Sequence, residues 1–159
     1  MKGQYANRRS WGSATLARNC KMKIKRIFLP LLAALAMALA GAANAGSPCD
    51  TVKPNFSHLI PNIPGKSLVA VEVLYPPGGA SLPHRHAKSA FIYAYVVSGR
   101  IVSRVGDGPE GVYSAGESFY ETPGSHHLVS RNASKTEPAK LLAVFIVDTD
   151  DMSLTIPDK

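Results

Sequence analysis

The chain has 159 residues, and its formal net charge of +7 comes from one end of the sequence. Residues 1–45 hold eight of the 18 Lys and Arg residues and none of the 11 Asp and Glu residues. The remaining 114 residues therefore carry 10 basic and 11 acidic residues, a net charge of −1. This body has no basic stripe, which argues against a nucleic-acid partner, and it has the length of one domain.

The first 45 residues have the pattern of a cleavable signal peptide. Four basic residues between positions 21 and 26 precede an apolar run from Ile27 to about Ala43, and the small-x-small sequence Ala43-Asn44-Ala45 follows. A start at Met22 leaves a signal of ordinary shape, so the segment is either 1–45 or 22–45. We expect the mature protein to be periplasmic or secreted, with no membrane contact after cleavage.

The mature sequence predicts an all-β domain between two irregular ends. Residues 46–66 are rich in proline and polar residues and are interpreted as an irregular N-terminal arm. Short runs rich in Val, Ile, Tyr and Phe, divided by Gly and Pro, predict strands in a barrel or sandwich over 67–148. The strands are expected at 68–75, 81–86, 91–97, 100–105, 117–122, 127–131 and 140–148. The acidic tail, 149–159, is expected to add an edge strand or to fray.

Three histidines are candidate metal ligands. His84 and His86 are two positions apart, so in a strand both side chains point to the same side. His127, from another strand, would complete a three-imidazole site for a divalent transition metal (Fe, Mn, Ni, Cu or Zn). Because neighbouring strand residues face opposite ways, only one of His126 and His127 can point inward. We favour His127.

The order of these residues resembles the two motifs of the cupin superfamily. Gly78, His84 and His86 follow the first motif, which closes at Gly99, and the second begins at Gly116. Gly124 and His127 fit the second motif in register, and sixteen residues separate Gly99 from Gly116. The resemblance implies an antiparallel jelly-roll barrel, a divalent metal on His84, His86 and His127, and a homodimer.

Two positions depart from the cupin pattern. The glutamate of the first motif is absent, because the residues at its expected place are Ala90, Phe91 or Ile92, which are all apolar. The asparagine of the second motif is one step late, at 132 instead of 131. Glu121, just before the turn that leads to His127, is the best candidate to restore the carboxylate. It would be a ligand, a hydrogen-bond acceptor for a histidine, or a general base.

Tyr95 is a second candidate catalytic residue. Tyr93 and Tyr95 share one face of their predicted strand with Phe91 and Val97. These side chains either pack in the core or place a tyrosine hydroxyl in the cavity where the glutamate is lost.

Two functions remain open. The resemblance implies an exported metal-dependent oxygenase, similar to quercetinase-type cupins, that oxidises or cleaves a small organic substrate with dioxygen. The alternative is a non-catalytic module that binds a small molecule or the metal itself. In both cases the partner is a small molecule.

Overall fold

The computed structural model describes residues 49–151 and 153–158, so the expected signal peptide lies outside the described residues. The described part of the chain consists of ten β-strands joined by turns and loops, without helices. It therefore offers no helix long and apolar enough to cross a membrane.

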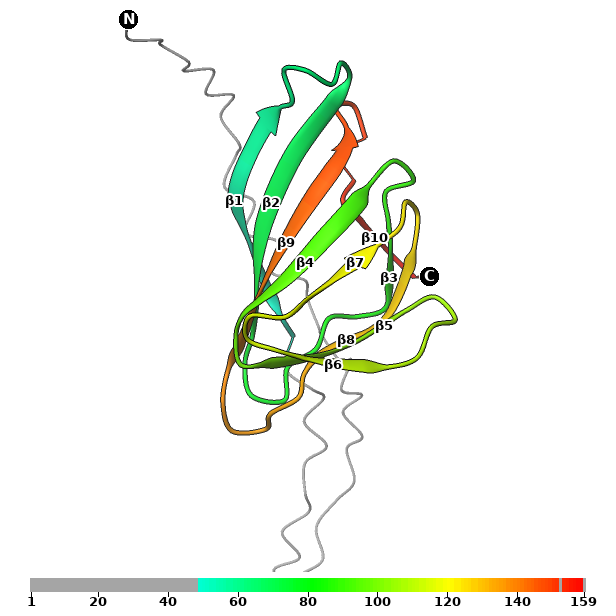
Figure 1. Cartoon of the computed structure of the whole chain (residues 1–159). Helices are drawn as coiled ribbons and strands as arrows, with labels where there is room; N and C mark the ends of the chain where they lie inside the picture. The colour runs from blue at the N-terminus through cyan, green and yellow to red at the C-terminus, as the bar shows by residue number, and fades with distance from the viewer. Residues whose placement is uncertain (1–48, 152, 159) are drawn as a thin grey trace, which may run out of the picture.

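The ten strands form two antiparallel five-stranded sheets (Figure 1). We name each sheet by its central strand. The β9 sheet has the order β1 (Thr51–Leu59), β2 (Lys66–Tyr75), β9 (Ala139–Asp148), β4 (Phe91–Ser98) and β7 (Ser118–Glu121). The β8 sheet has the order β10 (Thr155–Pro157), β3 (His84–His86), β8 (His126–Asn132), β5 (Arg100–Val105) and β6 (Gly111–Ser114).

The apolar core lies on the inner face of the β9 sheet. Alternate residues of β4, namely Ile92, Ala94 and Val96, are completely buried, as strand geometry requires for one face of a sheet. Leu141 and Phe145 of β9 belong to the same buried cluster. Burial of this apolar face against the opposite sheet is the main source of stability for such a two-layer fold.

All seven strands predicted from the sequence are present, with ends that differ by three residues or fewer. The interpretation of residues 46–66 as an irregular arm was wrong for 51–59, which form β1. β1 pairs only with β2, all its residues are exposed, and its register shifts between Pro54 and Phe56. Proline is tolerated in such an edge strand because its missing N–H breaks no internal ladder. This is why a polar, proline-containing segment still forms a strand.

The C-terminal tail also extends the fold. Thr155–Pro157 forms β10, an edge strand paired with β3. The sequence left an edge strand and fraying as alternatives, and the structure has the edge strand. Because β3 carries two of the predicted ligands, the tail packs directly against the candidate site.

Candidate metal site

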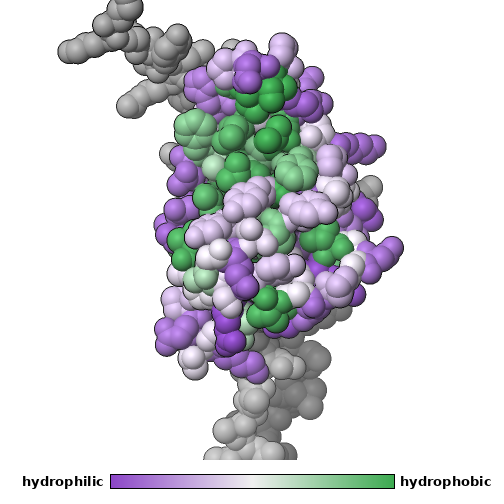
Figure 2. Space-filling model, in the orientation of Figure 1, coloured by the Kyte–Doolittle hydropathy of each residue, from purple (hydrophilic) through white to green (hydrophobic). Residues whose placement is uncertain are grey.

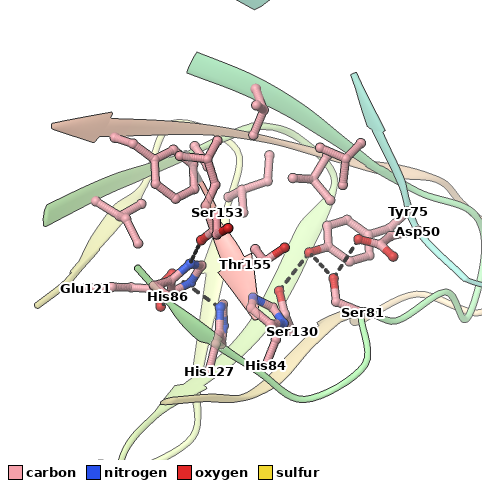
Figure 3. A pocket seen from close by; sticks show the side chains of 18 of the residues that line it. Asp50, Tyr75, Ser81, His84, His86, Glu121, His127, Ser130, Ser153 and Thr155 are labelled. Carbon is pink, nitrogen blue, oxygen red and sulfur yellow. Dashed lines mark hydrogen bonds and ion pairs between the residues drawn. The ribbon is translucent and has the colours of Figure 1, made fainter. Parts of the chain in front are cut away.

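The three predicted histidine ligands meet inside the molecule. His84 and His86 lie on β3, His127 lies on β8, and His84 pairs directly with His127 across the two strands. All three are buried, and one ligand nitrogen from each lies within 4.8 Å of the others. Figure 3 shows the rings turned toward one another at one end of a pocket. Between His84 and His86, the side chain of Arg85 is exposed, as the alternation of a strand requires.

Backbone carbonyls fix the orientation of both β3 histidines. Nδ1 of His84 lies 2.7 Å from the carbonyl oxygen of Leu82, and Nδ1 of His86 lies 2.9 Å from that of Leu154. A carbonyl oxygen can only accept, so in each neutral ring Nδ1 carries the proton and Nε2 keeps its lone pair. A hydrogen bond of this kind holds a metal-binding histidine in the correct tautomer.

The donor set fits a metal ion. Nε2 of His86 is buried and has no hydrogen-bond partner in the described structure, although it lies 3.0 Å from Oε2 of Glu121. Two lone-pair atoms facing each other at this distance are unfavourable unless a proton or a cation lies between them. Three imidazoles beside a carboxylate are suitable ligands for a divalent transition metal.

His127, and not His126, belongs to this cluster. Nε2 of His126 lies 2.7 Å from Oδ2 of Asp158, on the outer side of the sheet. His127 is buried, with Nε2 2.9 Å from Oγ of Ser103 and Nδ1 3.2 Å from Oε1 of Glu121.

Glu121 is the buried carboxylate of the site, at 3% exposure. Burial by itself raises the pKa of Glu121, but the imidazoles of His127 and His86 outweigh that effect and lower the pKa to about 2. The side chain is therefore ionised at neutral pH. Its two oxygens reach two different histidines, so one carboxylate connects β3 and β8 with β7.

Glu121 lies beside the position where the cupin glutamate is absent. Ile92 of β4 pairs directly with Glu121 of β7, and both side chains line the same cavity. Directly opposed residues in an antiparallel pair project from the same face of the sheet. The carboxylate of this site therefore comes from the strand adjacent to the one that the cupin pattern predicts.

The late asparagine of the second motif also has a structural explanation. The register between β5 and β8 shifts by one residue. Arg104 pairs with Val129, but Val105 pairs with His127, so Leu128 is an extra residue in β8. Such a β-bulge changes which residues of the strand face inward. As a result His127 and Asn132 are both buried, and Arg131 is exposed.

Tyr95 is not part of the site. The face of β4 that lines the core carries Ile92, Ala94 and Val96, so Tyr93 and Tyr95 project from the opposite face. Tyr95 is also not among the residues that line the pocket. The prediction of a cavity-lining Tyr95 hydroxyl is corrected.

The histidines occupy one end of a cavity of about 360 Å³. Its walls are mainly aliphatic and aromatic, and they include residues of β2, β4 and β9: Val71, Val73, Ile92, Leu141, Ala143 and Phe145. Burial and the neighbouring imidazoles lower the pKa of His84 to about 4, in spite of its bond to Leu82. His84 is therefore neutral, as a metal ligand must be, across the physiological pH range.

Several cavity residues were missed from the sequence. Asp50, Tyr75, Ser81 and Ser130 line the cavity without occupying a defining position of either motif, and Leu154 supplies the carbonyl that orients His86. They come from different strands and loops, so no spacing along the chain marks them. A tyrosine at the end of the aliphatic run of β2 was the one weak signal.

Comparisons with known proteins agree with this architecture. The cupin domain family matches residues 71–145. A crystal structure of TT1209 from Thermus thermophilus is 24% identical, with a TM-score of 0.50, and the match covers 62% of this chain and 83% of that one. At this identity the likeness shows the fold alone.

Two further structures are more distant. KdgF from a Halomonas species is 21% identical over 65% of this chain and 83% of its own, with a TM-score of 0.47. An oxalate oxidase in complex with the substrate analogue glycolate is 25% identical over 50% of this chain and 42% of its own, with a TM-score of 0.46. Both likenesses are too weak to indicate an activity, and no curated protein matches the sequence.

The family match covers both motifs, and the structure brings their histidines together between two antiparallel sheets. Residues 71–145 of this chain are a cupin domain.

Proposed function

We propose that this protein binds a divalent transition metal through His84, His86 and His127 and uses the site to bind and oxidise a small organic molecule. The observation that carries the proposal is the buried Nε2 of His86, which has no hydrogen-bond partner in the described structure and faces the Glu121 carboxylate. Fe, Mn, Ni, Cu and Zn all accept imidazole ligands, so the ligand set leaves the metal open.

Each residue has a distinct part in this proposal. The three imidazoles hold the ion, and Glu121 either joins them as a fourth ligand or accepts a hydrogen bond from Nδ1 of His127. A divalent ion bound there would act as a Lewis acid that stabilises a deprotonated oxygen of the substrate. Glu121 is the group near the histidines that accepts that proton, and the aliphatic wall excludes water from the bound molecule.

The reaction we propose is a quercetinase-like, metal-dependent cleavage or oxidation with dioxygen. One observation favours the second candidate, a non-catalytic binding module. The pKa of Glu121 is about 2, which makes it a weak base for removing a proton from a substrate hydroxyl.

We also propose the cellular setting and assembly. Residues 1–45 (or 22–45) would direct export and be removed, which leaves a periplasmic or secreted protein, and the two sheets would close into a jelly-roll barrel. The homodimer would use the outer face of the β9 sheet. Large side chains are exposed there, including Phe91, Tyr93, Tyr120 and Ile146. Figure 2 shows apolar residues gathered on this side, over β2, β9 and β4.

Elemental analysis of untagged protein tests the metal site. We expect about one transition-metal ion per chain in the wild type, and loss of that metal in His84→Ala. A His84→Ala variant that keeps its metal would show that the ligand assignment is wrong. Oxygen uptake by the metal-loaded protein with phenolic and diketone substrates then separates the two candidates. No uptake at full metal occupancy favours the binding module.

A further inference from the structure

The cavity has a second polar end, formed by four residues that we call the Asp50 cluster: Asp50, Tyr75, Ser81 and Ser130. Tyr75 closes this end and is 2% exposed, and its hydroxyl contacts Oγ of Ser130 at 2.7 Å and Oγ of Ser81 at 3.1 Å. Figure 3 shows Asp50, Tyr75 and Ser81 at one side of the pocket, Ser130 beside His84 in the middle, and Glu121 and His86 at the other side. Ser81 and Ser130 lie within the spans of the two cupin motifs but not at their defining positions, and Asp50 and Tyr75 lie outside both motifs.

The hydrogen bonds of the cluster run in one direction. Oγ of Ser81 donates to Oδ2 of Asp50 at 2.8 Å, so its single proton is already used. The Tyr75 hydroxyl must then donate to Ser81, and Ser130 must donate to Tyr75, for all three contacts to be satisfied. Burial, opposed by the bonds to the two serines, raises the pKa of Tyr75 to about 12, so the phenol keeps the proton that it donates.

All three hydroxyl protons are thus directed toward Asp50, and the cluster presents acceptors to the cavity. Oδ1 of Asp50 has no hydrogen-bond partner, and no Lys or Arg pairs with Asp50, in the described part of the chain. The cavity lining in that part of the chain likewise contains two carboxylates, Asp50 and Glu121, and no Lys or Arg. A ligand group that donates hydrogen bonds or carries a positive charge is favoured there, and an anionic group is repelled.

We propose that the Asp50 cluster binds an ammonium or hydroxyl group at the far end of the substrate. The substrate is then a small molecule with three parts: an oxygen donor for the metal, an apolar ring or chain against Val73 and Leu141, and a hydrogen-bond donor for Asp50. Dianionic molecules are excluded. The part of this inference that concerns the oxygen donor depends on the metal site of the proposed function. The preference for a hydrogen-bond donor at Asp50 does not depend on it.

Four rigid probes with one shared carboxylate test this specificity by titration calorimetry on metal-loaded protein: benzoate, 4-hydroxybenzoate, 4-(aminomethyl)benzoate and terephthalate. We expect 4-(aminomethyl)benzoate to bind about 10-fold more tightly than benzoate, since hydrogen bonds to a charged group are the strong ones. 4-Hydroxybenzoate should lie between these two, and terephthalate should bind most weakly. Asp50→Asn should remove the preference for the amine over benzoate.

Asp107→Asn makes the same chemical change in an exposed turn and should keep the wild-type order. Asp50→Ala is a second variant in case the asparagine disturbs the edge of β1, and it should lose the same preference. Equal affinities for benzoate and the amine, an unchanged preference in Asp50→Asn, or no binding of any probe would overturn the inference.

Metal-free protein separates this inference from the proposed function. In the metal-free protein, benzylamine should bind more tightly to the wild type than to Asp50→Asn. This result is expected whether or not the protein binds a metal when it is purified. A chain that binds no metal but keeps this benzylamine preference contradicts the proposed function alone. A chain that binds metal and benzoate without any effect of Asp50 contradicts the inference alone.

Discussion

The two sheets contribute opposite chemistry to the same cavity. The β8 sheet supplies the polar side, with three imidazoles on β3 and β8 and the hydroxyl of Ser130. The β9 sheet supplies the apolar wall and a single charge close to the histidines, Glu121 at the end of β7. Neither sheet has a complete site by itself. The candidate metal centre exists because packing of the hydrophobic wall brings one carboxylate against three histidines.

Acid should disrupt the two sides in different pH ranges. The pKa of His84 is about 4 in the folded chain and near 6.5 when unfolded, so the unfolded state takes up the proton first. The stability that depends on neutral His84 is complete above about pH 6.5. It is lost as the pH falls toward 4, and the loss is about 3 kcal/mol. Glu121 behaves in the same direction, with stability that is lost between about pH 4.5 and 2.

Urea unfolding of the metal-free protein at a series of pH values measures both steps. His84→Gln should flatten the upper step, and Glu121→Gln should flatten the lower one. If both variants followed the wild-type curve, the pKa of neither residue would differ between the folded and unfolded states.

The second-largest effect is expected when the charge of Glu121 is removed from the β9 sheet, which should weaken metal binding. In Glu121→Gln we expect the metal affinity to fall about 10- to 100-fold, because the carboxylate orients or joins the histidine ligands. Competition with a chelator of known affinity measures the change. Glu137→Gln, at an exposed position, is the matched control and should bind the metal as the wild type does.

Moving the carboxylate to the neighbouring strand should recover part of that loss. Ile92 and Glu121 are direct partners on the same face, so Glu121→Ile together with Ile92→Glu keeps one carboxylate and one isoleucine there. The double variant should bind metal about 10-fold more tightly than Glu121→Ile alone. Equal affinities for the two would mean that the position of the carboxylate on β7 is essential.

The smallest effect is expected on the outer face of the β9 sheet. Tyr95→Phe should change neither the metal affinity nor probe binding, because Tyr95 projects away from the cavity. A clear loss of probe affinity in Tyr95→Phe, measured by the same calorimetry, would place the hydroxyl in contact with the ligand after all.

The strands and the histidines could be predicted because both depend on short-range order. The His84-x-His86 spacing places two imidazoles on one side of any extended segment, and runs of Val, Ile, Tyr and Phe between turns form strands in any all-β context. The two faces of β4 are a different case. Residues 91–97 are apolar on both, so the pattern could not decide whether Tyr95 or Ile92 points inward.

The sequence by itself determined an all-β cupin domain and the three imidazoles that converge in it. Only the tertiary structure decided where the carboxylate lies, that a bulge in β8 turns Asn132 inward, and that the Asp50 cluster faces the histidines across one cavity. The physical reason is that these features arise from pairing between strands and packing between sheets. Residues that are distant in the chain become neighbours there without any spacing that the sequence could reveal.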